Sequence, residues 1–312
     1  MSAAISAAQR YRAMLDSGDF IVSPGIYDGY SARLVERAGF KTAATSGAAI
    51  ANSVLGIEDL GFMGLAENVG HCRNLIRAVS IPVTCDADTG YGNPVNVHHT
   101  VRMFEEAGAA GVNIEDQVAP KRCGHMVGKS VVDVREMQLK IEAACIARRD
   151  DAFVIVARTD AVATEGIEDA ARRAKAYAEA GADMIFPDAV RTEDDIKRIV
   201  DAAGVPVTIN MGFGIRQRPT TPLIPIPRLK EIGIRRISLP RMLPAAAIRA
   251  MGQALEVMRE VIETGQPADR PDLLASIEEI WALMGLEEAN RLEDRLLGRD
   301  GGYAKERAGA GS

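Results

Sequence analysis

The stretch that decides the fold is Ala107-Gly-Ala-Ala-Gly-Val-Asn-Ile-Glu-Asp116, where a helix-ending glycine precedes a short β-rich run. Glycine readily takes the left-handed backbone conformation that closes a helix, so Gly108 predicts a helix end just before a strand over 111–115. The predicted strand ends in two acids, Glu115 and Asp116. The same order, a small-residue stop followed by a short strand, recurs along the chain.

Eight β-rich runs alternate with longer segments of helical periodicity. They cover residues 20–23, 41–46, 82–86, 111–115, 153–158, 183–187, 206–210 and 234–239. Five of them follow a stop signal, which reads AGF, AGAAG, AGAD, AAGV or EIGI. Eight βα repeats predict an α/β protein with a (β/α)8 TIM barrel. A doubly wound open sheet is the alternative, but no Gly-x-Gly-x-x-Gly pattern follows an early strand.

Length and composition favour a soluble enzyme over a nucleic-acid or membrane protein. The 312 residues fit one barrel domain over 1–300, which includes two long helical patterns over 241–298, and a disordered tail over 301–312. A net charge of −6 and 4% aromatic residues argue against a nucleic-acid partner. No apolar run approaches the roughly 18–20 residues that cross a bilayer, and the four cysteines show no zinc or disulfide spacing. A reduced, cytoplasmic enzyme is expected.

Polar side chains end five successive predicted strands, and in a barrel these ends carry the catalytic groups. The side chains are Asp86 and Asp88, Glu115 and Asp116, Arg158 and Asp160, Asp188, and Asn210. Carboxylates this dense repel one another and need a cation. Oxygen ligands favour Mg²⁺, with Mn²⁺ as the alternative. Arg158 and Arg122 are expected to grip an anionic substrate, so the ligand is predicted to be a small oxyacid with several charges.

The pentapeptide Lys121-Arg-Cys-Gly-His125 places a cysteine among cations. Neighbouring positive charge stabilises a thiolate over a thiol, so Cys123 is suited to moving a proton. The alternative is a basic surface loop with an incidental cysteine.

These motifs together resemble the isocitrate lyase / phosphoenolpyruvate mutase superfamily over nearly the whole chain. The matching segments are TSGAAIANSVLGIEDLG (45–61), DADTGYG (86–92), NIEDQVAPKRCGH (113–125), ARTDA (157–161), IFPDA (185–189) and TTPL (220–223). The cysteine loop is similar to that of the carbon–carbon lyase branch, which includes 2-methylisocitrate lyase, 2,3-dimethylmalate lyase and oxaloacetate hydrolase. The mutases and phosphonopyruvate hydrolases lack that motif, which argues against phosphonate mutase activity.

The resemblance implies a Mg²⁺-dependent retro-aldol cleavage in which Cys123 is the general acid. The implied residues are Asp86, Asp88, Asp59 and Glu115 for the metal and its water shell; Thr45, Ser46, Gly47, Arg158, Asp188, Asn210 and Thr221 for the substrate; and Lys121, Arg122, Gly124 and His125 around the catalytic cysteine. The cysteine loop is expected to close over the substrate. The resemblance also implies a homotetramer in which a C-terminal helix crosses between barrels.

Several positions depart from 2-methylisocitrate lyase. Ala44 stands in place of an aromatic hydroxyl, Asn113 in place of a histidine and Asp188 in place of a glutamate. Fewer donors for a third carboxylate point to a 2-alkylmalate or 2,3-dimethylmalate, with 2-methylisocitrate kept as an alternative substrate. The general base is unassigned, with Tyr91 and Asp59 as candidates. Two other functions stay open: an oxaloacetate hydrolase or decarboxylase, and a non-catalytic oxoacid-binding protein.

Overall fold

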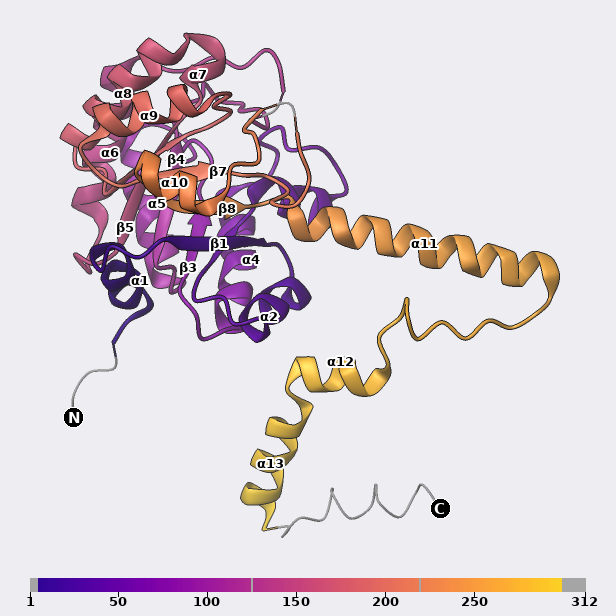
Figure 1. Cartoon of the computed structure of the whole chain (residues 1–312). Coiled ribbons are helices and arrows are strands. Elements are labelled where there is room, and N and C mark those ends of the chain that lie inside the picture. Colours follow the sequence, from indigo (N-terminus) through magenta and orange to yellow (C-terminus); the bar gives the residue numbers. More distant parts are fainter. Residues whose placement is uncertain (1–4, 125, 219, 299–312) are drawn as a thin grey trace. The chain divides into compact units, whose positions relative to one another are not determined.

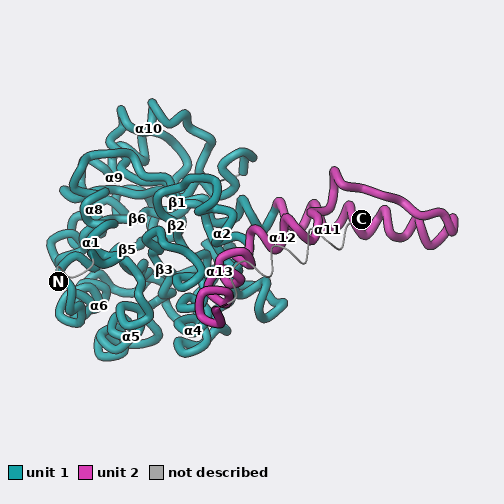
Figure 2. Tube along the Cα trace, turned by 90° about the horizontal axis from the view of Figure 1, so that it is seen from below, with its two compact units in different colours: residues 1–245 teal, residues 246–312 magenta. Residues whose placement is uncertain are grey.

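The computed structural model describes residues 5–124, 126–218 and 220–298. The chain divides into two compact units, residues 1–245 and 246–312, and this division falls inside the span predicted as one domain (Figure 2). His125 and the predicted tail over 301–312 lie outside the described residues. None of the described helices is long and apolar enough to cross a bilayer.

Eight parallel strands close a barrel in sequence order, which confirms the predicted (β/α)8 fold (Figure 1). They are β1 (Ile21–Ile26), β2 (Ala43–Thr45), β3 (Val83–Asp86), β4 (Gly111–Glu115), β5 (Val154–Thr159), β6 (Met184–Pro187), β7 (Val207–Asn210) and β8 (Ile234–Leu239). The main difference from the sequence prediction is that β1 continues beyond Ser23. The strand pairs with β8 as far as Pro24 and with β2 from Gly25 onward, so proline stands where the pairing changes sides.

Helices follow the strands and surround the barrel (Figure 1). They are α2 (Gly29–Arg37), α3 (Gly47–Ile50) with the π-helical turn η1 (Ala51–Leu55), α4 (Leu65–Arg77), α5 (Pro94–Glu106), α6 (Val134–Ala147), α7 (Ala161–Thr164), α8 (Ile167–Glu179), α9 (Glu193–Ala203) and α10 (Ile226–Ile232). Side-chain caps fix several starts: Asp28 accepts from the Ser31 N–H, and Thr192 accepts from the Asp195 N–H. Gly233, with φ of 102°, ends α10 directly before β8.

The hydrophobic core has two parts. The larger lies between strands and helices and includes Val35, Leu75 and Phe104. The smaller includes residues early in the strands, such as Ile21 and Val154, packed against side chains of α1 (Ala7–Asp16). Helix α1 therefore closes the N-terminal end of the barrel, and the C-terminal ends of the strands remain for polar side chains.

The C-terminal sequence forms three helices rather than the two predicted. They are α11 (Met242–Thr264), α12 (Ile277–Met284) and α13 (Leu286–Leu297). The second predicted pattern is split because Gly285, with φ of 80°, ends α12 and begins α13. Large apolar side chains on these helices are exposed in the single chain, among them Ile248, Leu255 and Leu296.

Candidate active site

A cavity opens among the C-terminal ends of the strands and has about 60 Å³ of space open to water-sized groups. Ten of the predicted site residues line it: Thr45, Ser46, Asp59, Asp86, Lys121, Cys123, Gly124, Arg158, Asp188 and Asn210. The remaining lining residues are Gly25, Ala44, Ala48, Asn113, Phe186, Arg236, Ser238, Pro240 and Arg241. Residues from all eight strands and the cysteine loop thus meet at one place, as the rule for barrel enzymes predicts.

The cysteine loop is tied to the barrel by its own backbone. The Cys123 N–H donates to the Asp59 carbonyl at 3.1 Å, and the Gln117 side chain bonds both the N–H and the carbonyl of Arg122 at 2.9 Å. Lys129 Nζ donates to the Gly124 carbonyl at 2.7 Å. These contacts hold the buried Cys123 side chain at the cavity while the Arg122 side chain is exposed. Arg122 therefore departs from the expectation that it grips the substrate.

Lys121 joins the carboxylates expected to hold the metal. Its Nζ lies 2.6 Å from Asp59 Oδ1 and 2.9 Å from Asp88 Oδ1, and all three side chains are buried. Burial, with the charges of Asp86 and Asp59, raises the pKa of Asp88 to about 6 against the opposing effect of the Lys121 charge. Burial lowers the pKa of Lys121, but the surrounding carboxylates outweigh burial and hold it well above its usual range.

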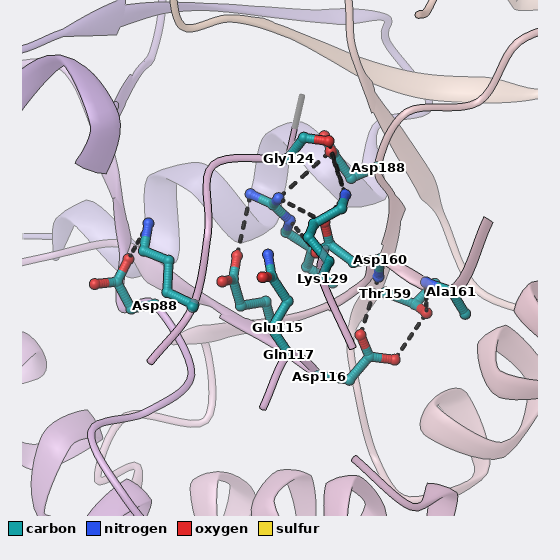
Figure 3. Close-up of polar contacts among 12 residues, drawn as sticks. Asp88, Glu115, Asp116, Gln117, Gly124, Lys129, Thr159, Asp160, Ala161 and Asp188 are labelled. Atoms are coloured by element: carbon teal, nitrogen blue, oxygen red, sulfur yellow. Dashed lines mark hydrogen bonds and ion pairs between the residues drawn. The ribbon is translucent and has the colours of Figure 1, made fainter. Parts of the chain in front are cut away.

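Arg158, at the end of β5, is surrounded by the carboxylates of Glu115, Asp160 and Asp188. Figure 3 shows these three acids with the cysteine loop residue Gly124. The Arg158 guanidinium lies 3.2 Å from Glu115, 2.9 Å from Asp160 and 3.4 Å from Asp188. Burial lowers the pKa of Arg158, but these carboxylates outweigh burial and raise it well above its usual range. Burial in turn raises the pKa of Glu115, against the charge of Arg158. The group is a fixed positive charge at the cavity wall.

Asp116 supports the site from outside the cavity. Its carboxylate accepts hydrogen bonds from the Thr159 hydroxyl at 2.8 Å and the Asp160 N–H at 2.9 Å (Figure 3). The Tyr177 hydroxyl donates to the same carboxylate at 2.8 Å. Asp116 thereby ties β4 to the turn after β5, which positions Asp160 and Arg158.

The segment after β2 presents its backbone to the cavity. Ser46 caps α3 by accepting from the Ala49 N–H, and the Gly47 N–H donates to Asp86 Oδ2 at 3.2 Å. A Cβ at Gly47 would lie 2.7 Å from that oxygen, so only glycine allows this approach. Asp88 holds the left-handed φ of 47°, a strained conformation of the kind concentrated at functional sites.

The structure separates the remaining predicted residues. Asn210 lines the cavity and accepts from the Ser238 hydroxyl at 3.0 Å, while Thr221 is buried beside Arg218 without lining the cavity. Of the two candidate bases, Asp59 lines the cavity and Tyr91 does not. Burial and the Asp88 charge raise the pKa of Tyr91, which opposes its use as a base.

Sequence reasoning missed two arginines that line the cavity. Arg241 donates from Nη2 to Cys123 Sγ at 3.2 Å and from Nη1 to Asn52 at 2.9 Å. It follows β8, so the rule that singled out the ends of five other strands would have found it if extended to the eighth. Arg236 lies within β8, where no motif drew attention to it.

The donor set suits a hard cation in type but is not spaced as a formed metal site. Asp86 borders the cavity, and Glu115 Oε1 is a buried oxygen without a hydrogen-bond partner. Among the residues with described positions, however, no three His, Cys, Asp or Glu side chains are grouped closely enough to hold a metal ion. Lys121 bonds Asp59 and Asp88 instead, so it supplies the positive charge that these acids need here.

Two curated relatives match nearly the whole chain. A 2-methylisocitrate lyase of Aeropyrum pernix is 40% identical over 297 residues, covering 92% of each chain. A 2,3-dimethylmalate lyase of Eubacterium barkeri is 37% identical over 289 residues, covering 93% of this chain and 98% of its own. Both names agree with the expected carbon–carbon lyase class.

Solved structures also match nearly the whole chain. An oxaloacetate acetylhydrolase bound to 3,3-difluorooxalacetate superposes with a TM-score of 0.85 at 32% identity, covering 94% of this chain and 98% of its own. A phosphonopyruvate hydrolase complex with oxalate and Mg²⁺ superposes with a TM-score of 0.77 at 31% identity, covering 94% and 99%. The phosphoenolpyruvate phosphomutase family pattern matches residues 11–259. The chain belongs to the phosphoenolpyruvate mutase / isocitrate lyase superfamily.

Proposed function

We propose that this carbon–carbon lyase cleaves a 2-alkylmalate, such as 2,3-dimethylmalate, by Mg²⁺-assisted retro-aldol chemistry. The C2–C3 bond breaks, the 2-hydroxyl loses its proton and becomes the ketone of pyruvate or a related oxoacid, and the bonding electrons pass to C3. A proton then reaches C3, which leaves as part of a carboxylate. 2-Methylisocitrate is the larger substrate of the same class.

The observation that carries the proposal is the position of Cys123. Its thiol borders the cavity and accepts a hydrogen bond from Arg241, on a loop that is fixed at Asp59, Gln117 and Lys129. A thiol held beside the cavity can protonate a carbanion-like carbon without admitting water. Asp59 is the cavity-lining candidate for the base that takes the hydroxyl proton.

The substrate's oxygens have donors at both ends of the cavity. The guanidinium of Arg158 can donate to a carboxylate of the substrate, and the Ser46 hydroxyl, which also lines the cavity, supplies a further donor. Asp188, Asn210 and Thr221 complete the proposed substrate set from the ends of β6 and β7 and the loop beyond.

Charge and volume favour a dicarboxylate over a tricarboxylate. Six acids and six cations lie in and directly around the cavity: Asp59, Asp86, Asp88, Glu115, Asp160 and Asp188, against Lys121, Lys129, Arg158, Arg218, Arg236 and Arg241. A divalent cation and a dianionic substrate preserve this balance, whereas a trianion leaves an excess negative charge. A cavity of about 60 Å³ also suits a small ligand.

We propose that Asp86 and Asp88 hold the metal, Asp86 partly through water, with Asp59 and Glu115 ordering the water shell. When bound, Mg²⁺ would polarise the substrate's hydroxyl and adjacent carboxylate. The similar phosphonopyruvate hydrolase was solved as a complex with Mg²⁺ and oxalate, which supports this choice of metal. Removing divalent metal with EDTA is expected to abolish turnover, and added Mg²⁺ is expected to restore it.

The deciding experiment is a substrate panel with Mg²⁺ and detection of pyruvate. Fastest cleavage of 2,3-dimethylmalate or a 2-alkylmalate is expected, and much faster cleavage of 2-methylisocitrate would overturn the substrate assignment. Cys123→Ser is expected to lose about a thousandfold in turnover, within the range for general acid catalysis combined with loss of the loop contact. Cys145→Ser, which alters a half-buried thiol on α6, is the matched control and should turn over normally.

Hydrolysis of oxaloacetate is the second candidate, favoured by the similarity to oxaloacetate acetylhydrolase. Formation of oxalate and acetate from oxaloacetate would identify hydrolysis, whereas formation of pyruvate would identify decarboxylation. If the wild-type protein turns over none of these acids but binds oxalate, the chain is an oxoacid-binding protein and the lyase proposal fails.

We also propose a cytoplasmic homotetramer. The exposed apolar side chains of α11, α12 and α13 support association with further copies, in which a helix crosses between barrels. Analytical ultracentrifugation of the full chain tests it, and a monomer at micromolar concentration would contradict it.

A further inference from the structure

Arg236 is a buried cation that the proposed reaction does not use. Its side chain is 1% exposed and lines the cavity from within the barrel. Nη2 donates to Thr84 Oγ1 at 3.1 Å, whereas Nε and Nη1 have no hydrogen-bond partner. Among the carboxylates of residues 5–124, 126–218 and 220–298, none lies within 4.0 Å of its guanidinium. Burying an ionised group without a counter-charge is costly, so the missing charge needs a source.

The same wall of the barrel carries further unused donors. In the register of β7 and β8, Asn210 pairs with Ser238 and Thr208 pairs with Arg236. Asn210 and Ser238 both line the cavity, so this row faces it, and side chains two residues back along each strand face the same way. Ser23 pairs with Ser238 across β1 and β8. The hydroxyls of both Thr208 and Ser23 are buried without partners.

Tyr11, which lies beside the Arg236 guanidinium, supplies no negative charge. The guanidinium lies 6.0 Å from the centre of the Tyr11 ring, and the Tyr11 hydroxyl is also without a hydrogen-bond partner. Burial raises the pKa of Tyr11, against the charge of Arg236, so the phenol stays neutral. Tyr11 is therefore another neutral neighbour.

We propose that Arg236, with the hydroxyls of Thr208 and Ser23, forms an anion-binding subsite at the floor of the pocket. The ligand is a small anionic group, either a carboxylate of the bound substrate or a free inorganic anion such as chloride. The cavity that Arg236 lines has about 60 Å³ of space open to water-sized groups, against the roughly 10–15 Å³ that a single water needs. The subsite does not depend on which reaction the rim catalyses, because it rests on contacts within the barrel.

Thermal unfolding tests whether the subsite binds a free inorganic anion. Wild type and Arg236→Met are compared in a buffer whose only anion is a bulky sulfonate, and chloride is then titrated at constant ionic strength. At about ten times the dissociation constant, chloride should raise the wild-type Tm by about 2–3 °C and leave Arg236→Met unchanged. Arg228→Met is the matched control: it removes the same charge from an exposed surface ion pair with Glu193 and should keep the chloride response.

Calorimetric titration with oxalate and with the longer succinate, both in the presence of Mg²⁺, tests whether the subsite binds a carboxylate of the substrate. If the subsite receives that group, Arg236→Met weakens at least one of the two ligands about tenfold or more. A chloride response without this loss assigns the subsite to a free anion. If chloride does not change the wild-type Tm and Arg236→Met binds both acids normally, the proposal is wrong.

Should Arg236→Met fail to fold, the double variant Ser23→Ala/Thr208→Val provides a second test. It removes two donors at unchanged charge and should reduce the same responses. None of these measurements requires turnover, so failure of the lyase assignment would be seen separately.

Discussion

Two arginines project into the same barrel, Arg158 from β5 and Arg236 from β8, and their surroundings are opposite. Arg158 has carboxylates of Glu115, Asp160 and Asp188 within 3.4 Å. Arg236 has a single threonine hydroxyl. The Arg236 side chain is buried, and the Arg158 side chain is only 12% exposed. One side of the barrel surrounds its cation with the protein's own acids, and the other holds its cation with a neutral hydroxyl.

The difference teaches that burial alone does not determine what an arginine contributes to the stability of the fold. The acids around Arg158 depend on it as much as it depends on them, so its removal leaves several buried negative charges. Removal of Arg236 leaves neutral hydroxyls behind. The same substitution at the two positions should therefore have opposite consequences for stability.

Arg158→Met has the largest expected effect. It leaves Glu115, Asp160 and Asp188 without their shared cation, so the free energy of unfolding should fall by about 3–5 kcal/mol. Cleavage should fall about a thousandfold, because the substrate's carboxylate also loses its partner. Chemical denaturation and the pyruvate assay measure the two effects.

Arg158→Lys and Arg236→Met serve as controls for this loss. The lysine keeps the charge but not the forked geometry, so stability should largely return while activity stays low. Arg236→Met should be as stable as wild type, or more so, in buffer without a small anion. Equal destabilisation by Arg158→Met and Arg236→Met would refute the distinction between the two sites.

Gly124→Ala comes next and acts on the loop above Arg158. A Cβ at this position would overlap the Asp188 carboxylate and lie 2.8 Å from Arg158 Nη2. The loop must then shift by about an ångström, which is expected to lower turnover about a hundredfold. Gly70→Ala in α4, where no atom lies within 4 Å of the added Cβ, should instead add about 0.5–1 kcal/mol of stability. Normal turnover of Gly124→Ala would mean that catalysis does not need the cysteine loop to pack this closely against Asp188 and Arg158.

The sequence was sufficient to predict the barrel and most of the polar residues at its rim around Arg158. All eight strands were predicted, and two of them, Gly111–Glu115 and Ile234–Leu239, with the observed bounds. The strand ends are visible because strong β-rich runs stop at polar residues, and closure of the barrel brings these ends together. The charge pattern singled out the cysteine loop and the resemblance supplied its expected role, although exposed Arg122 shows that sharing a loop does not place every side chain in the cavity.

The floor around Arg236 could not be predicted for a physical reason. Arg235 and Arg236 are adjacent in β8, and alternation places one of them inside the barrel, but which one depends on the strand register. Nor does sequence show that Arg236 lacks a carboxylate, since absence of a partner is a property of all neighbouring strands together. Arg241 was predictable in principle, because it follows a strand end directly.

Arg241→Met should have a moderate effect that connects the two regions, since Arg241 follows β8 but contacts the cysteine loop. Its guanidinium donates to Cys123 Sγ at 3.2 Å, and this bond holds the sulfur at the cavity wall. Turnover should fall about tenfold, as expected for the loss of a hydrogen bond to a charged group. Asn52→Ala removes only the second anchor of Arg241 and should lower turnover less. Unchanged turnover in Arg241→Met would rule out this role.

Thr84→Val has the smallest expected effect and isolates the one bond that Arg236 makes. The methyl group keeps the volume of the hydroxyl but leaves Nη2 unpartnered, so the free energy of unfolding should fall by about 1–3 kcal/mol in buffer without a small anion. Thr208→Val removes a hydroxyl that has no partner in the same wall, so it should be neutral or slightly stabilising there. In the Arg236→Met background, Thr84→Val should cost almost nothing, because the cation that needed the hydroxyl is gone. If Thr84→Val lowers the free energy of unfolding equally with and without Arg236, the threonine contributes by packing alone. Arg236 is then held by something other than the Thr84 hydroxyl.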